Sequence, residues 1–387
     1  MTQEVAIAGL GLTDVGKVYG RSAASFAAEA IRTAVEDAGL GLADVDGLLV
    51  SSGKSSGVDL SLAEGLGLSN LSLLAQVNAF GASAGAMVQS AAAAVNSGVA
   101  TTVVCVFADA PLRENVGAAA SYSRRASKGQ SALLVASGIT STTAYYALAA
   151  RRHMEAFGTT SKQLGAIAVS QREWAMRNPI AQMQKPITID DHQESRWIVE
   201  PLHLLDCCLV SNGGAAVVVT TGERARTLAQ APVYVWGSGQ GHPGYSWEKG
   251  SDFGLTTGAV QSGRAAMEMA GVSVDDISIR EIYDCYTYTT LVSLEDYGFC
   301  AKGEGGELAS SGALGPGGSL PTNTGGGQLS SFYLWGFTPL SEAIIQARGH
   351  GGERQVREND LVLVSGNGGI LQHHSTLIVS PHSKAGR

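Results

Sequence analysis

The sequence has no block of Lys or Arg residues and no long apolar run, and both absences limit what the protein can be. Its 26 basic residues are outnumbered by 34 acidic ones, which gives a net charge of −8. Nucleic-acid-binding domains usually carry a concentrated basic patch, so we expect no nucleic-acid partner. The sequence contains no run of about 18 apolar residues, so we expect no membrane-spanning helix.

Cysteine is also scarce. The five cysteines show none of the spacings typical of metal ligands, and an odd number argues against a framework of disulfides. The N-terminal stretch MTQEVAIAGLGLTDVG lacks the basic region and the long apolar core of a secretory signal. We therefore expect a cytoplasmic protein with reduced thiols and no bound metal.

Glycine and short apolar segments, in contrast, are abundant. Fifty glycines stand against ten prolines, and 44% of the residues are hydrophobic. Strand-like segments such as VAIAGLGLT and TTVVCVFADA alternate with helix-like segments such as SFAAEAIRTAVEDAGL. This alternation predicts an α/β fold with a mostly parallel or mixed central sheet and many tight turns.

Two stretches far apart in the chain share the same spacing of an Ala-Gly pair and an Asp residue. They are AVEDAGLGLADVDGLLV (34–50) and AMEMAGVSVDDISIREI (266–282). In each, an Ala-Gly pair is followed five residues later by Asp and a β-branched residue. The match predicts a duplicated fold, which we divide into an N-terminal half (1–230) and a C-terminal half (231–387).

The N-terminal half contains a long insertion, residues 112–205. It includes TTAYYALAARRHMEAFG and TSKQLGAIAVSQREWAMRNP, which both have helical spacing, and Thr160 or Ser161 is a plausible N-cap of the second helix. A connection of this length with helices of its own is more typical of a binding lid or substrate subdomain than of a linker.

Five segments have a distinctive order and spacing. They are RNP (177–179), PLHLLDCCLVSNGGAAVVVT (201–220), EIYDCYTYTT (281–290), LPTNTGGGQLSS (320–331) and VSGNGG (364–369). On these segments the chain resembles the thiolases, in particular the lipid-transfer-protein or sterol-carrier type, over essentially its whole length. The resemblance implies a thiolase-like duplicated α/β/α/β/α fold with a helical insertion in the first half.

The sequence departs from the thiolase pattern at all four catalytic positions. Thiolases use a cysteine nucleophile, a histidine, a second cysteine, and an Asn or His. The corresponding residues here are Gly81, Tyr333, Gly366 and Tyr283. Glycine cannot form a thioester, so ordinary thiolytic cleavage is not expected.

Two tyrosines among glycine turns suit a different reaction. The backbone amides of such turns can stabilise a thioester oxygen as an oxyanion hole does. We expect Asn323 to support one turn and Asn367 to offer a polar group to the pocket. The residues predicted to contact the substrate or its oxyanion are Gly81, Asn323, Gly326, Gly327, Asn367, Gly368 and Gly369.

A subset of lipid-transfer-type thiolase homologues are aldolases of steroid side-chain degradation, and the tyrosines resemble theirs. The resemblance implies retro-aldol cleavage of a β-hydroxyacyl-CoA with a tertiary hydroxyl, giving a ketone and a short acyl-CoA such as propionyl-CoA. We assign Tyr333 to the hydroxyl proton and Tyr283 to the enolate, although the roles could be exchanged. The usual phenol pKa of about 10 requires a relay or concerted proton transfer.

Other interpretations stay open. The tyrosines could be core residues of a non-catalytic subunit that binds an acyl-CoA or sterol, and Cys285 could support thiolytic transfer. We expect a strand over residues 279–287, which would make Tyr286 and Tyr288 further candidates. We interpret Cys207 and Cys208 as buried structural thiols and His242 as a loop residue. Since His373 and His374 are adjacent on an expected strand, we expect them to face opposite sides.

No covalently bound cofactor is expected, and coenzyme A enters as part of the substrate. Its phosphates could contact a group of basic residues in the insertion, for which a solvated surface is the alternative: Arg124, Arg125, Lys128 and Arg151. The resemblance also implies a homodimer core and a small partner protein of the DUF35 type, with an OB-fold and a zinc ribbon.

Overall fold

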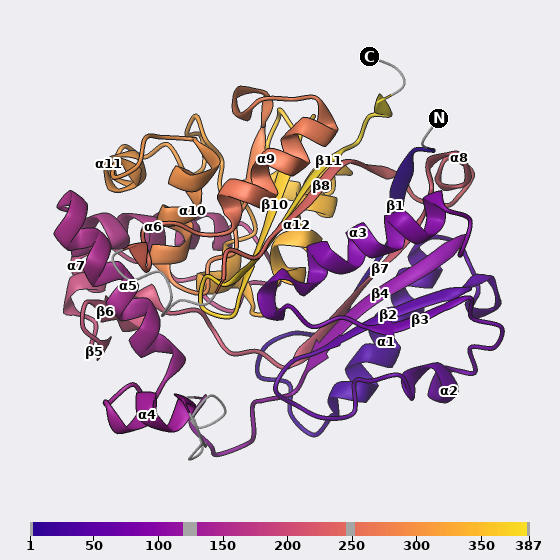
Figure 1. Ribbon diagram of the computed structural model, residues 1–387, viewed down its shortest axis with the longest axis horizontal. Coiled ribbons are helices and arrows are strands. Elements are labelled where there is room, and N and C mark those ends of the chain that lie inside the picture. The colour runs from indigo at the N-terminus through magenta and orange to yellow at the C-terminus, as the bar shows by residue number, and fades with distance from the viewer. Residues whose placement is uncertain (1–2, 119–129, 245–251, 385–387) are drawn as a thin grey trace.

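The computed structural model describes residues 3–118, 130–244 and 252–384. In these residues the two halves of the chain lie side by side around one nine-stranded mixed sheet, with strand order β3-β2-β4-β7-β1-β8-β11-β10-β9 (Figure 1). The strands are β1 (Val5–Leu12), β2 (Gly47–Ser52), β3 (Leu73–Gln76), β4 (Thr102–Asp109), β7 (Gly213–Thr221), β8 (Val233–Gly241), β9 (Ile279–Glu281), β10 (Val362–Gly368) and β11 (His373–Ser380). The short strands β5 (Trp197–Val199) and β6 (Leu202–His203) form a separate pair.

Strand pairing repeats between the halves. Strands β2, β4, β7 and β1 follow one another in the first half, and β9, β10, β11 and β8 follow in the same way in the second. The pairs β2–β4 and β9–β10 are parallel, whereas the remaining pairs within these two sets are antiparallel. The halves meet where β1 pairs with β8. The expected duplication is therefore visible in the topology. The boundary at 230/231 stays a prediction.

Helices form three layers around the two halves of the sheet. Helix α1 packs on β1, β4 and β7, and α9 packs on β8 and β11. Helices α3 and α12 contact strands of both halves and lie between them (Figure 1). The helices are α1 (Ala23–Asp37), α2 (Leu62–Leu66), α3 (Ser83–Asn96), α4 (Gln130–Ala136), α5 (Thr142–Phe157), α6 (Ser161–Ala175), α7 (Ile189–Glu194), α8 (Gly222–Ala225), α9 (Ala259–Ala270), α10 (Thr287–Tyr297), α11 (Gly305–Ser310) and α12 (Phe337–Ala347).

The two similar sequence stretches fold into the same unit. After α1 and α9 the chain turns at Gly39 and Gly271, whose φ angles of 72° and 71° favour glycine. Each turn leads to a short 3₁₀ helix in which Asp44 or Asp276 accepts a hydrogen bond from the backbone N–H three residues earlier. The strands β2 and β9 follow. The shared Ala-Gly and Asp positions thus encode the same helix–turn–strand unit in both halves.

A second feature common to both halves is the close approach of a helix to glycines of the central strands. A Cβ atom on Gly11 of β1 would lie 2.1 Å from the carbonyl oxygen of Ala30 in α1, and one on Gly237 of β8 would lie 2.0 Å from that of Ala266 in α9. Each strand has another glycine two residues away in the same environment. Only glycine allows the helix axes to come this near to the sheet.

The insertion supplies α4 to α7 and the β5–β6 pair, on the left in Figure 1. Both helices expected from its sequence are present as α5 and α6, and Thr160 is the N-cap of α6. Helix α6 packs against α10, α11 and the turn at residues 327–331. The insertion therefore lies against the C-terminal half.

One expected strand is wrong beyond its first three residues. Strand β9 ends at Glu281, and α10 begins at Thr287. The Oγ1 of Thr289 accepts a hydrogen bond from the backbone N–H of Tyr286, which satisfies a free donor at the helix start. Tyr286 and Tyr288 therefore do not share a strand with Tyr283.

No helix in residues 3–118, 130–244 and 252–384 is long and apolar enough to cross a membrane.

The glycine–helix contacts predict a stability effect common to both halves. Gly11→Ala and Gly237→Ala should each lower the free energy of unfolding by about 1–3 kcal/mol, because the new methyl group forces the helix from the sheet. Chemical denaturation would measure the change. Gly65→Ala in α2 is the matched control, since its Cβ meets nothing within 4 Å. The free energy of unfolding of this control variant should be unchanged or higher by up to about 1 kcal/mol. Equal stability of all three variants would contradict the packing argument.

Candidate active site

The two tyrosines singled out in the sequence lie together. The hydroxyl oxygens of Tyr283 and Tyr333 are 3.1 Å apart, within hydrogen-bond distance, although 50 residues separate them. Tyr283 follows β9 and is buried, and Tyr333 precedes α12 and is half-buried. Two loops at the same end of the C-terminal half therefore build a pair of adjacent phenols.

Gly81 makes room for this pair. It lies in the 3₁₀ turn before α3. A Cβ atom on Gly81 would lie 2.3 Å from the ring carbon Cζ of Tyr283 and 2.1 Å from the backbone oxygen of Asn367. The Tyr283 ring therefore fills the space that a side chain at this position would need. A cysteine side chain would therefore have no space at position 81, because the Tyr283 ring occupies it.

Gly366, at the position of the second thiolase cysteine, is equally enclosed. Its Cβ would lie 2.6 Å from Oγ of Ser375 and 2.8 Å from the backbone oxygen of Gly81. Strand β10 thus packs directly on the turn that carries Gly81. Neither glycine position has space for the side chain that thiolases place there.

The glycine turn before Tyr333 is tied to the segment before Tyr283. Asn323 has a positive φ of 53°, and its Oδ1 accepts a 2.6 Å hydrogen bond from the backbone N–H of Ile282. The N–H of Gly326 donates to the backbone oxygen of Asn323 at 2.8 Å. Asn323 therefore holds the turn in place. The Gly326 amide is engaged within the turn, and its expected role toward substrate stays a prediction.

Asp284 fastens the same two segments from the other side. Its carboxylate accepts hydrogen bonds from the backbone N–H groups of Gln328 (2.8 Å) and Leu329 (3.1 Å). These amides belong to a π-helical turn, Gly327–Ser331, a rare form that is frequent at functional sites. Burial raises the pKa of Asp284 from 3.8 to about 7. Asp284 was not among the predicted site residues, although an acidic residue next to Tyr283 is a usable signal in the sequence.

Further support comes from the first half and its insertion. Asn178 of the RNP segment donates to the backbone oxygen of Gly325 (2.8 Å), and Arg172 of α6 donates to Oγ of Ser330 (2.9 Å). Oγ of Ser211 accepts the backbone N–H of Tyr333 at 2.9 Å. The RNP segment indicated the resemblance, but no sequence pattern predicted the contact of Asn178 with the turn.

The loop after β10 closes on the Gly81 turn, but the Asn367 side chain does not face it. The Cβ positions of Gly366 and Gly368 point toward the Gly81 turn, so the strand alternation directs Asn367 to the opposite face. Its side-chain amide is buried there and has no hydrogen-bond partner within the part of the chain that the structure describes. Gly369, with a φ of 62°, turns the chain just beyond. The substrate roles predicted for Asn367, Gly368 and Gly369 remain predictions.

Three residues other than glycine have positive φ angles around the pair. They are Phe80 (52°), Asn323 (53°) and Trp335 (50°), and the rings of Phe80 and Trp335 are 6.0 Å apart. Such conformations cost of order 1–3 kcal/mol each and persist where the surroundings impose them. The backbone beside Gly81 and beside Tyr333 is therefore strained at the point where the loops meet.

The nearby thiols are poor nucleophiles. Burial raises the pKa of Cys285 to about 12, and burial also raises the pKa values of Cys207 and Cys208. The backbone N–H of Cys208 donates to the backbone oxygen of Cys285, so the three cysteines lie in adjoining segments. A thiol that stays protonated does not attack a thioester at neutral pH.

The histidines fall on two sides of the sheet. His373 stacks on the exposed ring of Phe80, and its Nδ1 lies 3.0 Å from Nδ1 of His242. His242 follows β8, as expected for a loop residue, and its contact with His373 places it near Phe80, next to Gly81. His374 is buried on the other face, where burial lowers its pKa to about 3. The prediction that His373 and His374 face opposite sides is confirmed.

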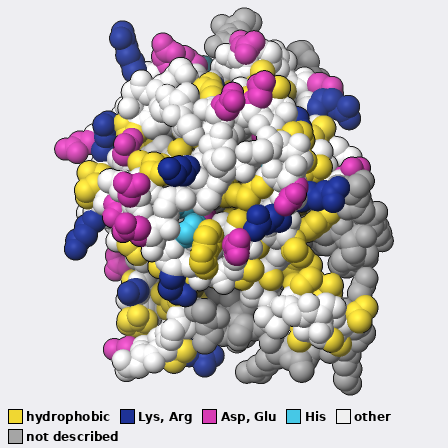
Figure 2. Space-filling model, turned by 90° about the vertical axis from the view of Figure 1, so that its left-hand side faces the viewer, with side chains coloured by type: hydrophobic (Ala, Val, Ile, Leu, Met, Phe, Trp, Pro, Cys, Tyr) yellow, Lys and Arg dark blue, Asp and Glu magenta, His cyan; other side chains and the backbone are white. Residues whose placement is uncertain are grey.

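The expected coenzyme A contacts are placed only in part. Arg151 lies on the exposed surface of α5 and pairs with Glu200 at 2.8 Å. Arg124, Arg125 and Lys128 lie outside the described residues. Figure 2 shows Lys and Arg side chains interspersed with Asp and Glu on the described part of one face, without a continuous basic area.

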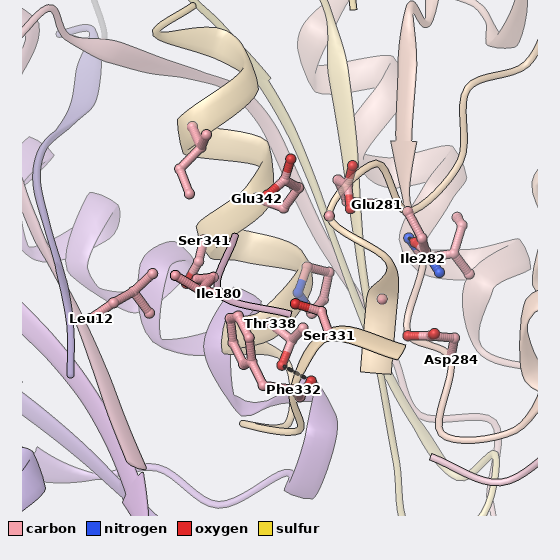
Figure 3. A pocket seen from close by; sticks show the side chains of 15 residues that line it. Leu12, Ile180, Glu281, Ile282, Asp284, Ser331, Phe332, Thr338, Ser341 and Glu342 are labelled. Carbon is pink, nitrogen blue, oxygen red and sulfur yellow. Dashed lines mark hydrogen bonds between the residues drawn. The ribbon is translucent and has the colours of Figure 1, made fainter. Parts of the chain in front are cut away.

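A small cavity lies behind the glycine turn. Its volume is about 10 Å³, room for about one water molecule. Glu281 of β9, Asp284 and Glu342 of α12 line it together (Figure 3). Glu342 is paired with Arg354 at 2.9 Å. The cavity is too small for an acyl chain.

No group of three or more His, Cys, Asp or Glu side chains in the described ranges could hold a metal ion.

Comparison with known proteins agrees with this geometry. The family models "Thiolase, N-terminal domain" and "Thiolase C-terminal domain-like" match residues 5–223 and 239–381. The steroid side-chain-cleaving aldolase of Thermomonospora curvata is 38% identical over 373 residues, which cover 94% of this chain and 95% of that relative. The 17-hydroxy-3-oxo-4-pregnene-20-carboxyl-CoA lyase of Mycobacterium tuberculosis is 38% identical over 360 residues, 90% of this chain and 92% of the relative.

A solved structure described as "Ltp2-ChsH2(DUF35) aldolase" has a TM-score of 0.87 and 38% identity, and the match covers 98% of each chain. The chain belongs to the thiolase family. The predicted family and the predicted thiolase-like fold are therefore confirmed, whereas the roles assigned to single residues remain predictions.

The buried carboxylate predicts an acidic limit to activity. Below a pH of about 7, Asp284 takes up a proton and accepts the two amide hydrogen bonds less strongly, so activity should decrease as the pH falls through this value. Its effect on stability runs the other way. The folded-state pKa is raised, so between about pH 4 and 7 the folded state binds the extra proton and the free energy of unfolding decreases as pH rises.

Asp284→Asn is the variant that checks this limit. The Asn side chain retains an oxygen that can accept hydrogen bonds from the two backbone N–H groups, but it has no group that titrates. The variant should lack the change near pH 7 in a pH profile of kcat/KM. Glu281, Cys208 and Cys285, which interact electrostatically with Asp284, remain in both proteins. Coincident profiles would exclude Asp284 as the titrating group.

Proposed function

We propose that this chain is an aldolase that cleaves the Cα–Cβ bond of a β-hydroxyacyl-CoA. The observation that carries the proposal is the pair of phenols, 3.1 Å apart, in the space of the missing thiolase nucleophile. The favoured substrate is a steroid side-chain CoA thioester with a tertiary hydroxyl, and the products are a ketone and a short acyl-CoA such as propionyl-CoA. The carbon–carbon lyase class expected from the sequence agrees with the names of both relatives.

The hydrogen bond between the phenols allows a balanced proton relay. The β-hydroxyl gives its proton to the first phenol oxygen as that phenol passes its own proton to the second. The electrons of the Cα–Cβ bond move to Cα while the hydroxyl oxygen becomes the carbonyl of the ketone. As it accepts that proton, the second phenol gives its own proton to Cα of the enolate, so the transfers are concerted and both phenols end neutral. No free phenolate is needed, which removes the difficulty of the high phenol pKa.

Acyl transfer is the weaker candidate for this site. A covalent intermediate needs an activated nucleophile, and the Tyr283 ring occupies the space beside Gly81. The raised pKa of Cys285 argues against this thiol as a replacement. A carrier that only holds an acyl-CoA would have no use for two hydroxyl groups held within hydrogen-bond distance.

Coenzyme A belongs to the substrate in this proposal, and no covalently bound cofactor is required. A homodimer core and a DUF35-type partner are part of the proposal. The description of the similar solved structure names a DUF35 component, which supports the partner.

Product analysis tests the function. A tertiary β-hydroxyacyl-CoA of a steroid side chain would be incubated with the protein alone and with a DUF35-type partner, each with and without free coenzyme A. Mass spectrometry should detect the ketone and the shorter acyl-CoA without free coenzyme A. Cleavage that depends on free coenzyme A would indicate thiolytic transfer. Substrate that binds without cleavage under every condition would indicate a carrier.

Removing either phenol should stop the relay. Tyr283→Phe and Tyr333→Phe should each lower kcat/KM by roughly 10²–10⁴-fold, the usual effect of losing a general acid or base. Steady-state kinetics with circular dichroism would separate this loss from misfolding. Tyr286→Phe is the matched control, because its hydroxyl bonds to Thr143 at 2.9 Å. A loss in the control equal to that in the pair would contradict the assignment.

Isotope exchange assigns the two roles. With propionyl-CoA in heavy water, the enzyme should exchange the Cα hydrogens for deuterium, since the phenol at the enolate can pass its own proton to water in place of the other phenol. If Tyr283 serves the enolate, Tyr283→Phe should lose the exchange and Tyr333→Phe should retain most of it. Nuclear magnetic resonance of the recovered thioester measures both. The opposite pattern would exchange the roles of the tyrosines.

A further inference from the structure

A surface hollow of about 470 Å³ lies beside β9, among the segments that precede β9, follow α10 and precede β10. Apolar side chains, including Ile277, Leu320 and Val356, form part of its wall, and Arg280 and Phe299 also line it. None of Gly81, Tyr283 and Tyr333 contributes to the lining. We call this site the Arg280 hollow. It is distinct from the phenol pair.

Among the described residues, Arg280 is a buried cation without an anionic partner. Arg280 is only 4% exposed, and its guanidinium carbon lies 4.7 Å from the ring centre of Phe299. Two of its nitrogens donate to the backbone oxygens of Ile277 and Ser278, at 2.6 and 3.0 Å. Its Nε has no hydrogen-bond partner. None of the ion pairs in the described parts of the chain includes Arg280.

This arrangement is costly unless something compensates it. Buried charges in proteins are normally paired, because removal from water costs several kcal/mol per ion. Burial lowers the pKa of Arg280 to about 10, as expected when no nearby carboxylate stabilises the cation. Asp275 and Glu358 also line the hollow but form no ion pair with it. The two backbone oxygens and the Phe299 ring carry no full negative charge, so the cation is compensated only in part.

The walls of the hollow define the chemistry of an anion that would complete this compensation. A guanidinium offers a planar fork of donors that matches a carboxylate, and the ring of Phe299 and the aliphatic side chains suit an apolar body. The volume lies within the range of small-molecule sites. We propose that the Arg280 hollow is a second binding site, which takes a small carboxylate with a short apolar tail.

Calorimetric titration with octanoate tests the proposal, with sodium chloride keeping the ionic strength constant. The wild-type protein should bind octanoate at one saturable site. Arg280→Met should weaken binding at least tenfold, because it removes the cation and keeps most of the apolar stem. Arg264→Met, an exposed arginine of α9 outside the hollow, is the matched control and should bind as the wild type does. Tyr283→Phe should also bind normally, which separates this site from the phenol pair whether or not the aldolase proposal holds.

A second variant keeps the test valid if Arg280→Met does not fold. Ser319 is exposed at the edge of the hollow, so Ser319→Trp should fill the entrance without touching the buried guanidinium. It should lose octanoate binding while its thermal unfolding without ligand is unchanged. Binding that survives both substitutions, or no saturable binding to the wild type, would overturn the proposal. So would a DUF35-type protein that binds through Arg280 while octanoate does not bind.

Discussion

The site depends on one steric exchange: the ring of Tyr283 occupies the space that a side chain at position 81 would need. Once the ring is there, its hydroxyl lies beside that of Tyr333, and no nucleophile can stand at the start of α3. The loss of the thiol and the gain of the phenol pair are therefore one structural event. The reaction proposed for the site follows from this exchange, because it replaces a covalent step by proton transfer.

The surrounding structure holds two loops in register. Asn323 and Asp284 join the segments that carry the tyrosines through hydrogen bonds to backbone N–H groups. Asn178 and Ser211 connect the same turn to the insertion and to the first half. A pair of hydroxyls 3.1 Å apart requires this control, because a shift of one ångström in either loop would break their hydrogen bond. The duplicated scaffold, with its glycine–helix contacts, provides the rigid base on which the loops rest.

The sequence predicted the fold and the tyrosine pair because both leave local signals. The Ala-Gly pairs at matching positions encode the turns after α1 and α9. The motif positions alone identified Tyr283 and Tyr333. Three features could not be read in this way. The end of β9 at Glu281 goes with the hydrogen bonds that the Asp284 carboxylate accepts from Gln328 and Leu329, more than 40 residues later. The role of Asn178 depends on the packing of the insertion, and the isolation of Arg280 depends on which side chains fail to reach it. Each is a property of tertiary contacts.

The crowding at Gly81 also restricts how a protein of this fold could pass from one chemistry to the other. A cysteine at position 81 and a tyrosine at position 283 compete for the same volume, so they exclude each other. Along a path of single substitutions, the glycine can come before the tyrosine but not after it. The intermediate would have neither the thiol nor the completed phenol pair. A lineage that made this change therefore passed through a form without either catalyst, which a spare gene copy can tolerate and a sole essential enzyme cannot.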